Sequence, residues 1–556
     1  MNPPDPRWYK DAVLYEIPVK AFYDSNGDGI GDLPGLVQKL DYLKDLGVDC
    51  LWLLPFYQSP LKDDGYDISD YYRIHPDLGT LEDFDRLIEE AHRRELRVIA
   101  DLVLNHVSDQ HPWFQEARAD PASPRRPWFV WSDTDRKYAG TRIIFLDSER
   151  SNWTWDPVAK QYFWHRFYSH QPDLNYDHPP VREAMKEVIR FWLRRGLDGF
   201  RCDAVPYLFE AEGTSSENLP ATHAYLKELR RMVDSEFPNR VLLAEANQWP
   251  SDVKAYFGEE DEFHMAFNFP LMPRIFIALA KESALPIREL VAQTLPIPAS
   301  CAWGVFLRNH DELTLEMVTD EERDFMYHEY AKHPKMRLNL GIRRRLAPLV
   351  DDDRRVMELL HGLLLSLPGV PILYYGDELG MGDNIYLGDR AGVRTPMQWS
   401  PDRNAGFSRA DPEQLYAPVI INPNFHFESR NVESLRRMPP SFLNWLIRQL
   451  RVRRRYSKVF GRGTIEFIDT PHPKVLIYRR SFEGTELLCL FNLSRAPSAV
   501  ELDLAGFRGY TPVEMVSEAP FPPIGELPYF LTLAERGFYW FRLDPPAASR
   551  PDDGPR

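Results

Sequence analysis

Eight short apolar runs, separated by stretches of helical periodicity, dominate the pattern of hydrophobic and polar positions along the chain. The runs are rich in β-branched and aromatic residues and span 13–18, 50–54, 97–104, 199–204, 241–246, 263–269, 302–309 and 370–375. Residues 33–46 carry apolar side chains at helical spacing, and residues 81–96 do so again after Thr80, a typical N-cap. Eight strands that alternate with helices predict an α/β fold, the (β/α)8 TIM barrel, whose active-site residues follow the carboxyl ends of the strands.

Two connections are too long for ordinary barrel loops. The first, after the third strand, is crowded with aromatic residues, Arg and Pro and predicts an inserted subdomain. The second, beyond the seventh strand, is rich in Glu, Arg and His. It is either a helical flap over the active site or a solvated helical excursion. The sequence thus divides into the first segment of the barrel (1–104), the inserted subdomain (105–171), the remainder of the barrel (172–455) with a lid insertion at about 312–355, a C-terminal antiparallel β-sandwich domain (456–546) and a disordered tail (547–556).

Composition narrows the classes of partner. The 67 basic and 83 acidic side chains give a net charge of −16, which disfavours nucleic acid and anionic membranes because phosphate binding needs a basic surface. The N-terminus lacks the apolar segment of a secretion signal, and no apolar span of membrane length follows. Four widely spaced cysteines predict core thiols in a reducing compartment. The chain is therefore expected to be cytoplasmic.

Three of the predicted strands end in a carboxylate. Asp203, Glu245 and Asp311 each close an apolar run, where an ionised group is costly unless it is paired or used. Because strand ends meet at one face of a barrel, these three acids predict a single site. Two acids are the minimum for cutting a glycosidic bond, since one attacks or activates while the other protonates the leaving oxygen.

The neighbours of the acids suggest different tasks. Arg201 lies two residues before Asp203, on the same face of the strand, and favours an ionised carboxylate there. A structural ion pair is the plain alternative. Glu245 follows aliphatic residues, and a dry setting would raise its pKa, as a general acid requires.

Basic runs at 343–345 and 453–455 are interpreted as solvated helix faces.

Two histidines, a tyrosine and an aspartate adjoin the predicted strand ends. His106 and His310 are interpreted as donors to sugar hydroxyls; core packing and metal ligation are the alternatives, and no zinc-like spacing supports the last. Tyr66, in a loop with Asp63, could stack on a pyranose ring while the acid binds hydroxyls.

An acidic loop near the N-terminus resembles the opening of a calcium loop. Its candidate ligands are Asp24, Asn26, Asp28, the Ile30 carbonyl and Asp32. The twelfth position is glycine, so the bidentate glutamate of a full EF-hand is missing, and a turn with solvated acids is the alternative. The ion would be calcium, or magnesium at this loop.

Together these motifs resemble the α-amylase superfamily, glycoside hydrolase family 13. The motifs that carry the resemblance lie at 101–106, 171–175, 199–203, Glu245, 310–311 and 369–376. Motif for motif, the resemblance extends over nearly the whole chain. It implies a retaining double displacement with Asp203 as nucleophile, Glu245 as acid/base and Asp311 as the third carboxylate, which binds the distorted sugar.

The resemblance also implies the remaining site residues. Arg201, His106 and His310 match substrate-binding positions, and Asp63, Tyr66 and Arg394 would close the pocket around the non-reducing glucose. A further calcium site is implied at Asn105, Asp173, the Tyr207 and Leu208 carbonyls and Glu210. No organic cofactor is expected.

Segments at 131–134, 141–155, 204–208, 245–249 and 268–276 are similar to those of the isomerases that interconvert maltose and trehalose. The expected reaction is therefore intramolecular glucosyl transfer with minor hydrolysis to glucose. The alternatives are an α-glucosidase or oligo-1,6-glucosidase with an open site, and a non-catalytic scaffold. A homodimer is left open. A latch is hypothesised between Arg142 or Arg150 and one of Glu321, Glu322 and Glu329, because transfer needs water excluded.

Overall fold

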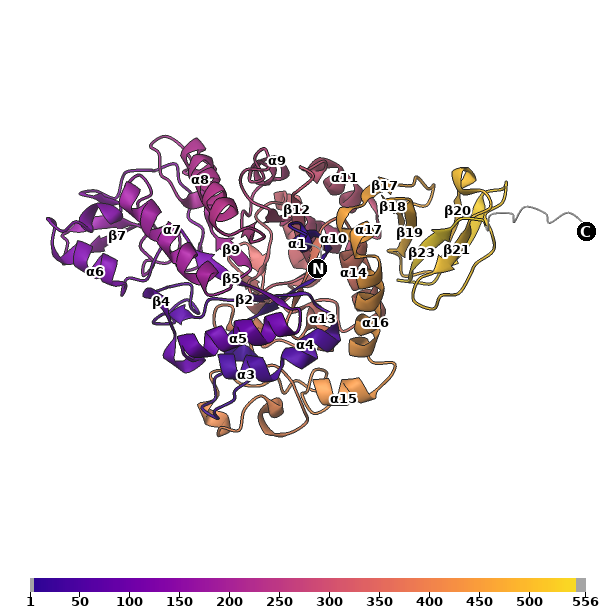
Figure 1. Cartoon of the computed structure of the whole chain (residues 1–556), viewed down its shortest axis with the longest axis horizontal. Coiled ribbons are helices and arrows are strands. Elements are labelled where there is room, and N and C mark those ends of the chain that lie inside the picture. The colour runs from indigo at the N-terminus through magenta and orange to yellow at the C-terminus, as the bar shows by residue number, and fades with distance from the viewer. Residues whose placement is uncertain (1–4, 547–556) are drawn as a thin grey trace, which may run out of the picture.

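A closed barrel of eight parallel strands forms the centre of the computed structural model, which describes residues 5–546 (Figure 1). In their order around the barrel the strands are β1 (Leu14–Ile17), β16 (Val370–Tyr374), β12 (Ala302–Phe306), β11 (Met265–Phe267), β10 (Val241–Ala244), β9 (Gly199–Asp203), β5 (Arg97–Val103) and β2 (Cys50–Leu53). Each strand lies within one of the eight predicted runs. The TIM barrel prediction is therefore confirmed.

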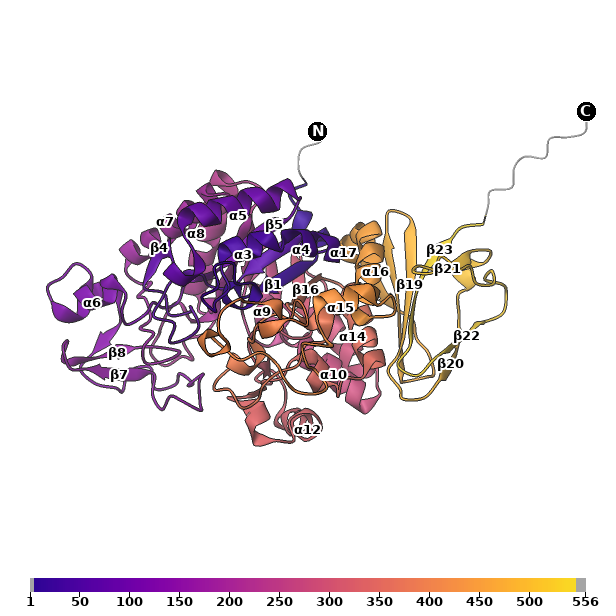
Figure 2. The ribbon, with the colours of Figure 1, turned by 90° about the horizontal axis from the view of Figure 1, so that it is seen from below.

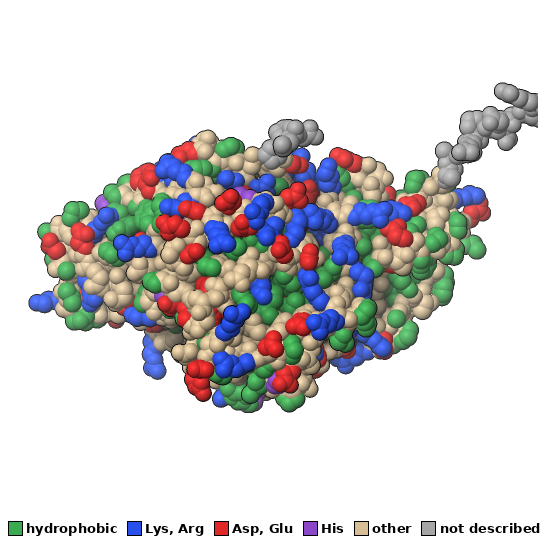
Figure 3. Space-filling view, turned by 60° about the horizontal axis from the view of Figure 1, so that its bottom comes forward, with side chains coloured by type: hydrophobic (Ala, Val, Ile, Leu, Met, Phe, Trp, Pro, Cys, Tyr) green, Lys and Arg blue, Asp and Glu red, His purple; other side chains and the backbone are tan. Residues whose placement is uncertain are grey.

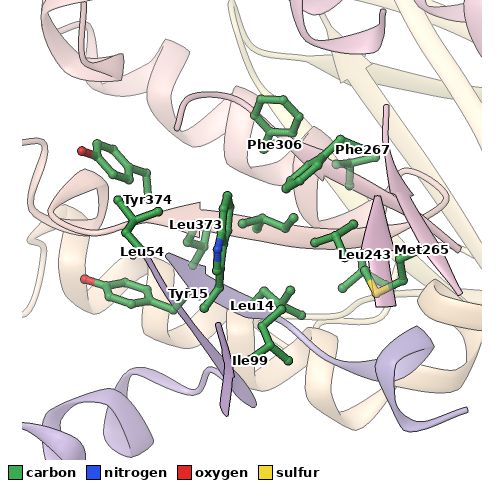
Figure 4. Packing of buried hydrophobic residues seen from close by; sticks show 14 of the residues in the cluster. Leu14, Tyr15, Leu54, Ile99, Leu243, Met265, Phe267, Phe306, Leu373 and Tyr374 are labelled. Carbon is green, nitrogen blue, oxygen red and sulfur yellow. The ribbon is translucent and has the colours of Figure 1, made fainter. Parts of the chain in front are cut away.

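The barrel interior is packed with side chains from many strands. Figure 4 shows Leu14, Leu243, Phe267 and Phe306 converging from different strands. The Phe267 and Phe306 rings meet edge to face, with centroids 5.4 Å apart, a favoured aromatic geometry. Because both faces of each strand are buried, the strands appear in the sequence as continuous apolar runs. A filled interior leaves only the strand ends for chemistry.

Helices surround the barrel. The principal ones are α3 (Leu33–Gln38), α4 (Leu40–Leu46), α5 (Leu81–Arg93), α7 (Pro179–Arg194), α8 (Pro220–Glu236), α10 (Leu271–Lys281), α11 (Leu285–Thr294), α14 (Arg354–Ser366) and α16 (Phe442–Arg455). Thr80 caps α5 as predicted, in a reciprocal capping box with Asp83. The helix expected over 33–46 is in fact two helices, α3 and α4, which meet at Lys39.

The segment after β5 holds its own small structure at one end of the molecule (Figure 2). It contains α6 (Pro112–Ala119) and a three-stranded antiparallel sheet of β6 (Trp131–Ser132), β8 (Gln161–Trp164) and β7 (Trp153–Asp156). Stacked and edge-on aromatic rings, including Phe114 against Trp131, fill it. This is the subdomain expected after the third strand of the barrel.

The segment beyond β12 is a mixed structure rather than a purely helical flap. It contains α12 (Asp320–Tyr330) and a small antiparallel sheet of β13 (Leu313–Thr314), β15 (Gly341–Ile342) and β14 (Arg337–Leu338). Its first strand follows Asp311 directly, so this segment borders the site. We call residues 312–345 the lid.

The C-terminal domain lies at the opposite end of the molecule from α6 (Figures 1 and 2). It has a five-stranded antiparallel sheet of β17 (Thr464–Phe467), β18 (Val475–Phe482), β19 (Thr485–Asn492), β23 (Phe538–Asp544) and β21 (Thr511–Glu514), and a two-stranded sheet of β20 (Ser498–Leu502) and β22 (Tyr529–Leu533). A separate apolar cluster packs between these strands. The antiparallel β-domain of the prediction is confirmed. The tail 547–556 lies outside the described residues.

The interpretation of both basic runs as solvated faces is wrong for two of the arginines. Arg345 and Arg453 are fully buried. Arg453 on α16 donates to the carbonyls of Leu365 in α14 and Gly369 just before β16, two buried groups that need a donor from the protein. These arginines therefore act as internal cross-links.

The surface carries side chains of both charges (Figure 3), and the cysteines are buried. On the face shown in Figure 3, acidic and basic side chains are interspersed. All four cysteines are buried and unpaired, as predicted. None of the helices within residues 5–546 has the length and apolar character needed to cross a bilayer.

Candidate active site

The three predicted acids converge at the carboxyl end of the barrel. Asp203 is the last residue of β9, Glu245 follows β10, and Asp311 lies five residues beyond β12. All three line one pocket, together with Asp63, Tyr66, His106, Ile144, Phe145, Phe167, Ala204, Tyr207, Asn247, Phe269, Asn309, Glu312, Thr314, Glu316 and Arg390. Parallel pairing of neighbouring strands in register brings their ends together, as the fold requires.

Arg201 holds the first two acids side by side. Its Nη1 donates to Asp203 Oδ1 at 2.7 Å, and its Nη2 lies 2.5 Å from Glu245 Oε1. A third carboxylate, Asp101 on β5, pairs with the same guanidinium, because Asp101 and Arg201 are partners in the parallel register. Asp203 and Glu245 also lie within hydrogen-bond reach of each other. Closely spaced carboxyl groups are typical of retaining rather than inverting glycosidases.

Burial shifts the pKa of both acids upward, and neighbouring charges modify the shift. Burial, together with the carboxylates of Asp203 and Asp311, raises the pKa of Glu245 to about 8, although Arg201 opposes the shift. Burial also raises the pKa of Asp203, and Arg201 acts against it. Glu245 is thus protonated at neutral pH, as a general acid requires.

Asp311 is held ionised by cations. Arg390 Nη1 and Arg394 Nη2 donate to its Oδ1 at 2.9 and 2.8 Å, and His310 Nε2 lies 3.1 Å from its Oδ2. Burial opposes the charge, but these cations outweigh it and hold the pKa of Asp311 well below its usual range. A carboxylate of this kind can accept sugar hydroxyls without taking up a proton.

Asp63 and Tyr66 close the other side of the pocket. Asp63 accepts from Gln171 Nε2 at 2.9 Å and from Arg390 Nη2 at 2.6 Å. The Tyr66 hydroxyl lies 2.8 Å from His310 Nε2, and its ring stacks on that imidazole. Arg390 was missed by sequence reasoning, because an arginine in a Gly/Asp loop carries no strand or helix pattern.

His106 and Arg394 also lie at the site. His106 Nε2 is buried without a protein partner and lines the pocket, and burial lowers the pKa of this imidazole to about 3. A neutral ring with a free nitrogen suits a sugar hydroxyl. Arg394 donates to the His310 carbonyl at 2.9 Å and to Asp64 at 2.7 Å, so it braces the wall of the pocket.

The inserted subdomain and the lid meet across the pocket. Arg142 Nη1 donates to Glu316 Oε2 at 2.9 Å, and its Nε donates to Glu217 at 2.8 Å. Asn247, two residues after Glu245, donates to the same Glu316 oxygen at 3.1 Å. A second bridge runs from the Asn339 backbone N–H in the lid to Asp147 at 2.8 Å.

The predicted latch partners of Arg142 need correction. Its glutamates are Glu316 and Glu217 rather than Glu321, Glu322 or Glu329. Glu322 instead caps α12 and pairs with Arg274 on the barrel side at 3.1 Å. The helix of the lid therefore faces α10, and its first strand faces the pocket.

The two predicted metal sites differ in how their ligands are arranged. In the acidic loop, Asp24 accepts from the backbone of Asn26, Gly27 and Gly29, and Asp32 accepts from that of Ser25 and Gly35. Asp28 accepts from the Ile30 N–H. Within residues 5–546, no group of three or more His, Cys, Asp and Glu side chains is arranged to hold a metal. Calcium also uses amide and carbonyl oxygens, so the loop site stays a prediction.

At the second site the candidate oxygens lack partners. Asn105 Oδ1, Asp173 Oδ2 and Glu210 Oε1 are buried and accept no hydrogen bond from the protein. Burial raises the pKa of Asp173 to about 8 and that of Glu210 well above its usual value, to which the Asp173 charge contributes. Orphaned, mutually repelling oxygens fit a hard cation.

The chain matches a family model described as the catalytic domain of alpha amylase over residues 16–340 and 342–463. It belongs to the α-amylase family. A second model, the C-terminal domain of maltogenic amylase, matches residues 465–540.

Relatives with nearly the same length share much of the sequence. The chain is 60% identical to a trehalose synthase/amylase of Mycobacterium tuberculosis over 97% of this chain and 91% of the relative. It is 56% identical to a trehalose synthase of Pimelobacter sp., covering 98% of each. Among solved structures, a mutant trehalulose synthase superimposes with a TM-score of 0.79 at 29% identity, covering 97% of this chain and all of the other.

Proposed function

We propose that this enzyme converts maltose into trehalose, reversibly, by intramolecular glucosyl transfer. The observation that carries the proposal is the identity of 55–60% to trehalose synthases over nearly the full length of the chain. The geometry supports it, because paired acids on Arg201 suit a retaining displacement and the bridged lid suits an enclosed intermediate.

In the first step, Asp203 attacks the anomeric carbon of the non-reducing glucose of maltose. The bond to O4 breaks with its electron pair, and Glu245 donates its proton to that oxygen. The result is a covalent glucosyl-enzyme ester and a free glucose. The high pKa of Glu245 supports this role, since the acid must be protonated when the substrate binds.

In the second step, the freed glucose turns within the closed pocket. Its anomeric hydroxyl attacks the glucosyl carbon, Glu245 takes the proton, and the ester bond to Asp203 breaks. Two inversions give net retention and an α,α-1,1 linkage. Polar side chains at the lid side of the pocket, Asn247, Thr314 and Glu316, support this turn because they offer hydrogen bonds to more than one orientation of a sugar.

Calcium at the second metal site belongs to the proposal. Asn105, Asp173 and Glu210, with the carbonyls of Tyr207 and Leu208, would hold it. The ion would supply charge neutralisation rather than chemistry. Asn105 follows β5 and Asp173 pairs with His106 in an isolated bridge, so an ion there would brace a pocket wall.

The product mixture from maltose tests the proposed function. Purified enzyme incubated with maltose should form mostly trehalose, with little glucose, and trehalose should return maltose. A mixture dominated by glucose would instead support the α-glucosidase alternative, for which a probable α-glucosidase of Rhizobium meliloti at 33% identity is a precedent.

A further inference from the structure

A glutamate inside the first barrel strand contacts the active-site histidine from behind. Glu16 on β1 is fully buried. Its Oε1 accepts from the His310 backbone N–H at 3.1 Å and lies 2.5 Å from His310 Nδ1. Apolar residues flank Glu16 on both sides in the sequence, and an acid in such a strand is costly unless it is paired.

The two ring nitrogens of His310 face two different carboxylates. Nδ1 meets Glu16, and Nε2 lies 3.1 Å from Asp311 Oδ2. A carboxylate accepts and cannot donate, so both nitrogens must carry protons for both contacts to be favourable. The geometry therefore describes an imidazolium between two anions.

The Tyr66 hydroxyl is a second partner of His310 Nε2, at 2.8 Å. It donates its own proton to Asp101 Oδ2 at 3.2 Å, so its oxygen can accept from a protonated Nε2. Asp101 also faces His310, and Arg394 donates to the His310 backbone carbonyl. Arg308, Tyr374 and Asp377 lie near enough to Glu16 to interact with its charge. The pKa of His310 is raised to about 9: burial opposes the charge, and Asp311 and Glu16 outweigh it.

We propose that Glu16 is a positioning residue for catalysis: through His310 it maintains the proton that His310 donates to Asp311. Glu16 does not touch the sugar. It holds the ring by Nδ1, so that Nε2 remains a donor to the third carboxylate. The proposal rests on the retaining chemistry of the proposed function but not on which product is released.

Glu16→Gln is the informative substitution. The amide oxygen can still accept from Nδ1, so the ring stays in place, but the negative charge is lost. Without that charge the imidazolium is less stable, the pKa of His310 falls, and Nε2 loses its proton at a lower pH. Activity should then be lost at a lower pH than in the wild type.

The measurement is the pH dependence of kcat/KM with p-nitrophenyl α-glucoside. Nitrophenolate leaves with little help from Glu245, so the alkaline limb reports the His310–Asp311 pair, and release of nitrophenol does not depend on trehalose formation. E16Q should remain within about threefold of the wild type at pH 6 and fall about tenfold below it at pH 8, as a downward pKa shift of about two units requires.

Glu378→Gln is the matched control. Glu378 is also buried and accepts from the Tyr15 and Tyr42 hydroxyls rather than from His310. E378Q should keep the wild-type alkaline limb. An E16Q enzyme with an unshifted limb would overturn the proposal, as would an equal shift in E378Q.

A measurement on the unaltered enzyme covers the case in which E16Q does not fold. ¹⁵N-histidine NMR of the wild type at pH 7, assigned with His310→Asn, should show both nitrogens of His310 protonated. A neutral His310 at that pH would overturn the proposal. Failure to make trehalose, by contrast, would contradict the proposed function alone.

Discussion

Arg201 illustrates at the residue scale how one side chain organises several acids. Its guanidinium contacts Asp101, Asp203 and Glu245. Sequence reasoning anticipated the Asp203 contact from a spacing of two in a strand, but not the other two. Contacts between strands depend on register, which the sequence of one strand does not contain.

The pKa of Glu245 leads to a prediction for maltose. Because the acid must be protonated and its pKa is raised to about 8, kcat/KM for maltose should fall as pH rises through about 8. A pH–rate profile checks this. A limb that stays flat beyond pH 9 would contradict the assignment.

Glu245→Gln provides the control for this pH dependence. E245Q should lose turnover of maltose by at least about two orders of magnitude. It should keep a fast first step with α-glucosyl fluoride, since fluoride leaves without a proton. Equal losses with both substrates would point to a damaged fold.

The elements that border the pocket come from three regions of the chain. The lid, the inserted subdomain and the loop that carries Arg390 are joined by side chains rather than by strand pairing. Arg343 of the lid donates to the carbonyls of Ile385 and Leu387, beside Arg390. These contacts join the lid to the loop that forms the pocket wall.

The latch leads to a prediction about product ratio. Arg142→Met removes the bridge to Glu316, so water should enter during the turn and glucose should rise relative to trehalose by several-fold. Chromatography of products from maltose measures the ratio. Arg190→Met, which breaks an exposed Arg–Glu pair between α7 and α8, is the control and should leave it unchanged. A product ratio that stays constant in both variants would mean that the Arg142–Glu316 bridge does not exclude water.

Calcium should stabilise the junction of the inserted subdomain with the barrel. Removing it with a chelator should lower Tm by several degrees, since two buried carboxylates then repel each other. Differential scanning calorimetry with and without added calcium measures this. Asp173→Asn should abolish the dependence of Tm on calcium. A wild-type Tm that changes with neither chelator nor added calcium would contradict the site.

The sequence predicts the strands and helices that carry a continuous or periodic apolar pattern. It does not predict the elements that lack such a pattern. All eight strands and the helices α5 and α16 carry continuous or periodic apolar patterns. The short strands of the lid, such as Gly341–Ile342, have no such pattern and form only by pairing with distant residues. The Arg142 partners were missed for the same reason.

Buried arginines join neighbouring elements, and in one case two domains, at the scale of the whole molecule. Arg453 on α16 and Arg480 on β18 both donate to carbonyls at the end of α14, at Leu365 and Ser366 respectively. The charge of Arg453 suggested exposure, since the sequence does not reveal which face of a basic helix meets its neighbours.

Arg453→Met should lower the free energy of unfolding by about 2–4 kcal/mol, because buried carbonyls lose their donor. Urea unfolding followed by circular dichroism measures the loss. Arg454→Met, at the exposed neighbouring position, should cost less than about 0.5 kcal/mol. Equal effects would mean that the carbonyl contacts do not stabilise the domain.

Enclosure of the freed glucose is tested most directly by isotope exchange. Maltose is converted in the presence of excess ¹³C-glucose, and the label in the trehalose is measured by mass spectrometry. An intermediate sealed by the lid predicts trehalose that is almost free of label throughout the reaction. Label that approaches the proportion in the medium would show that glucose leaves and returns, and would contradict the enclosed transfer.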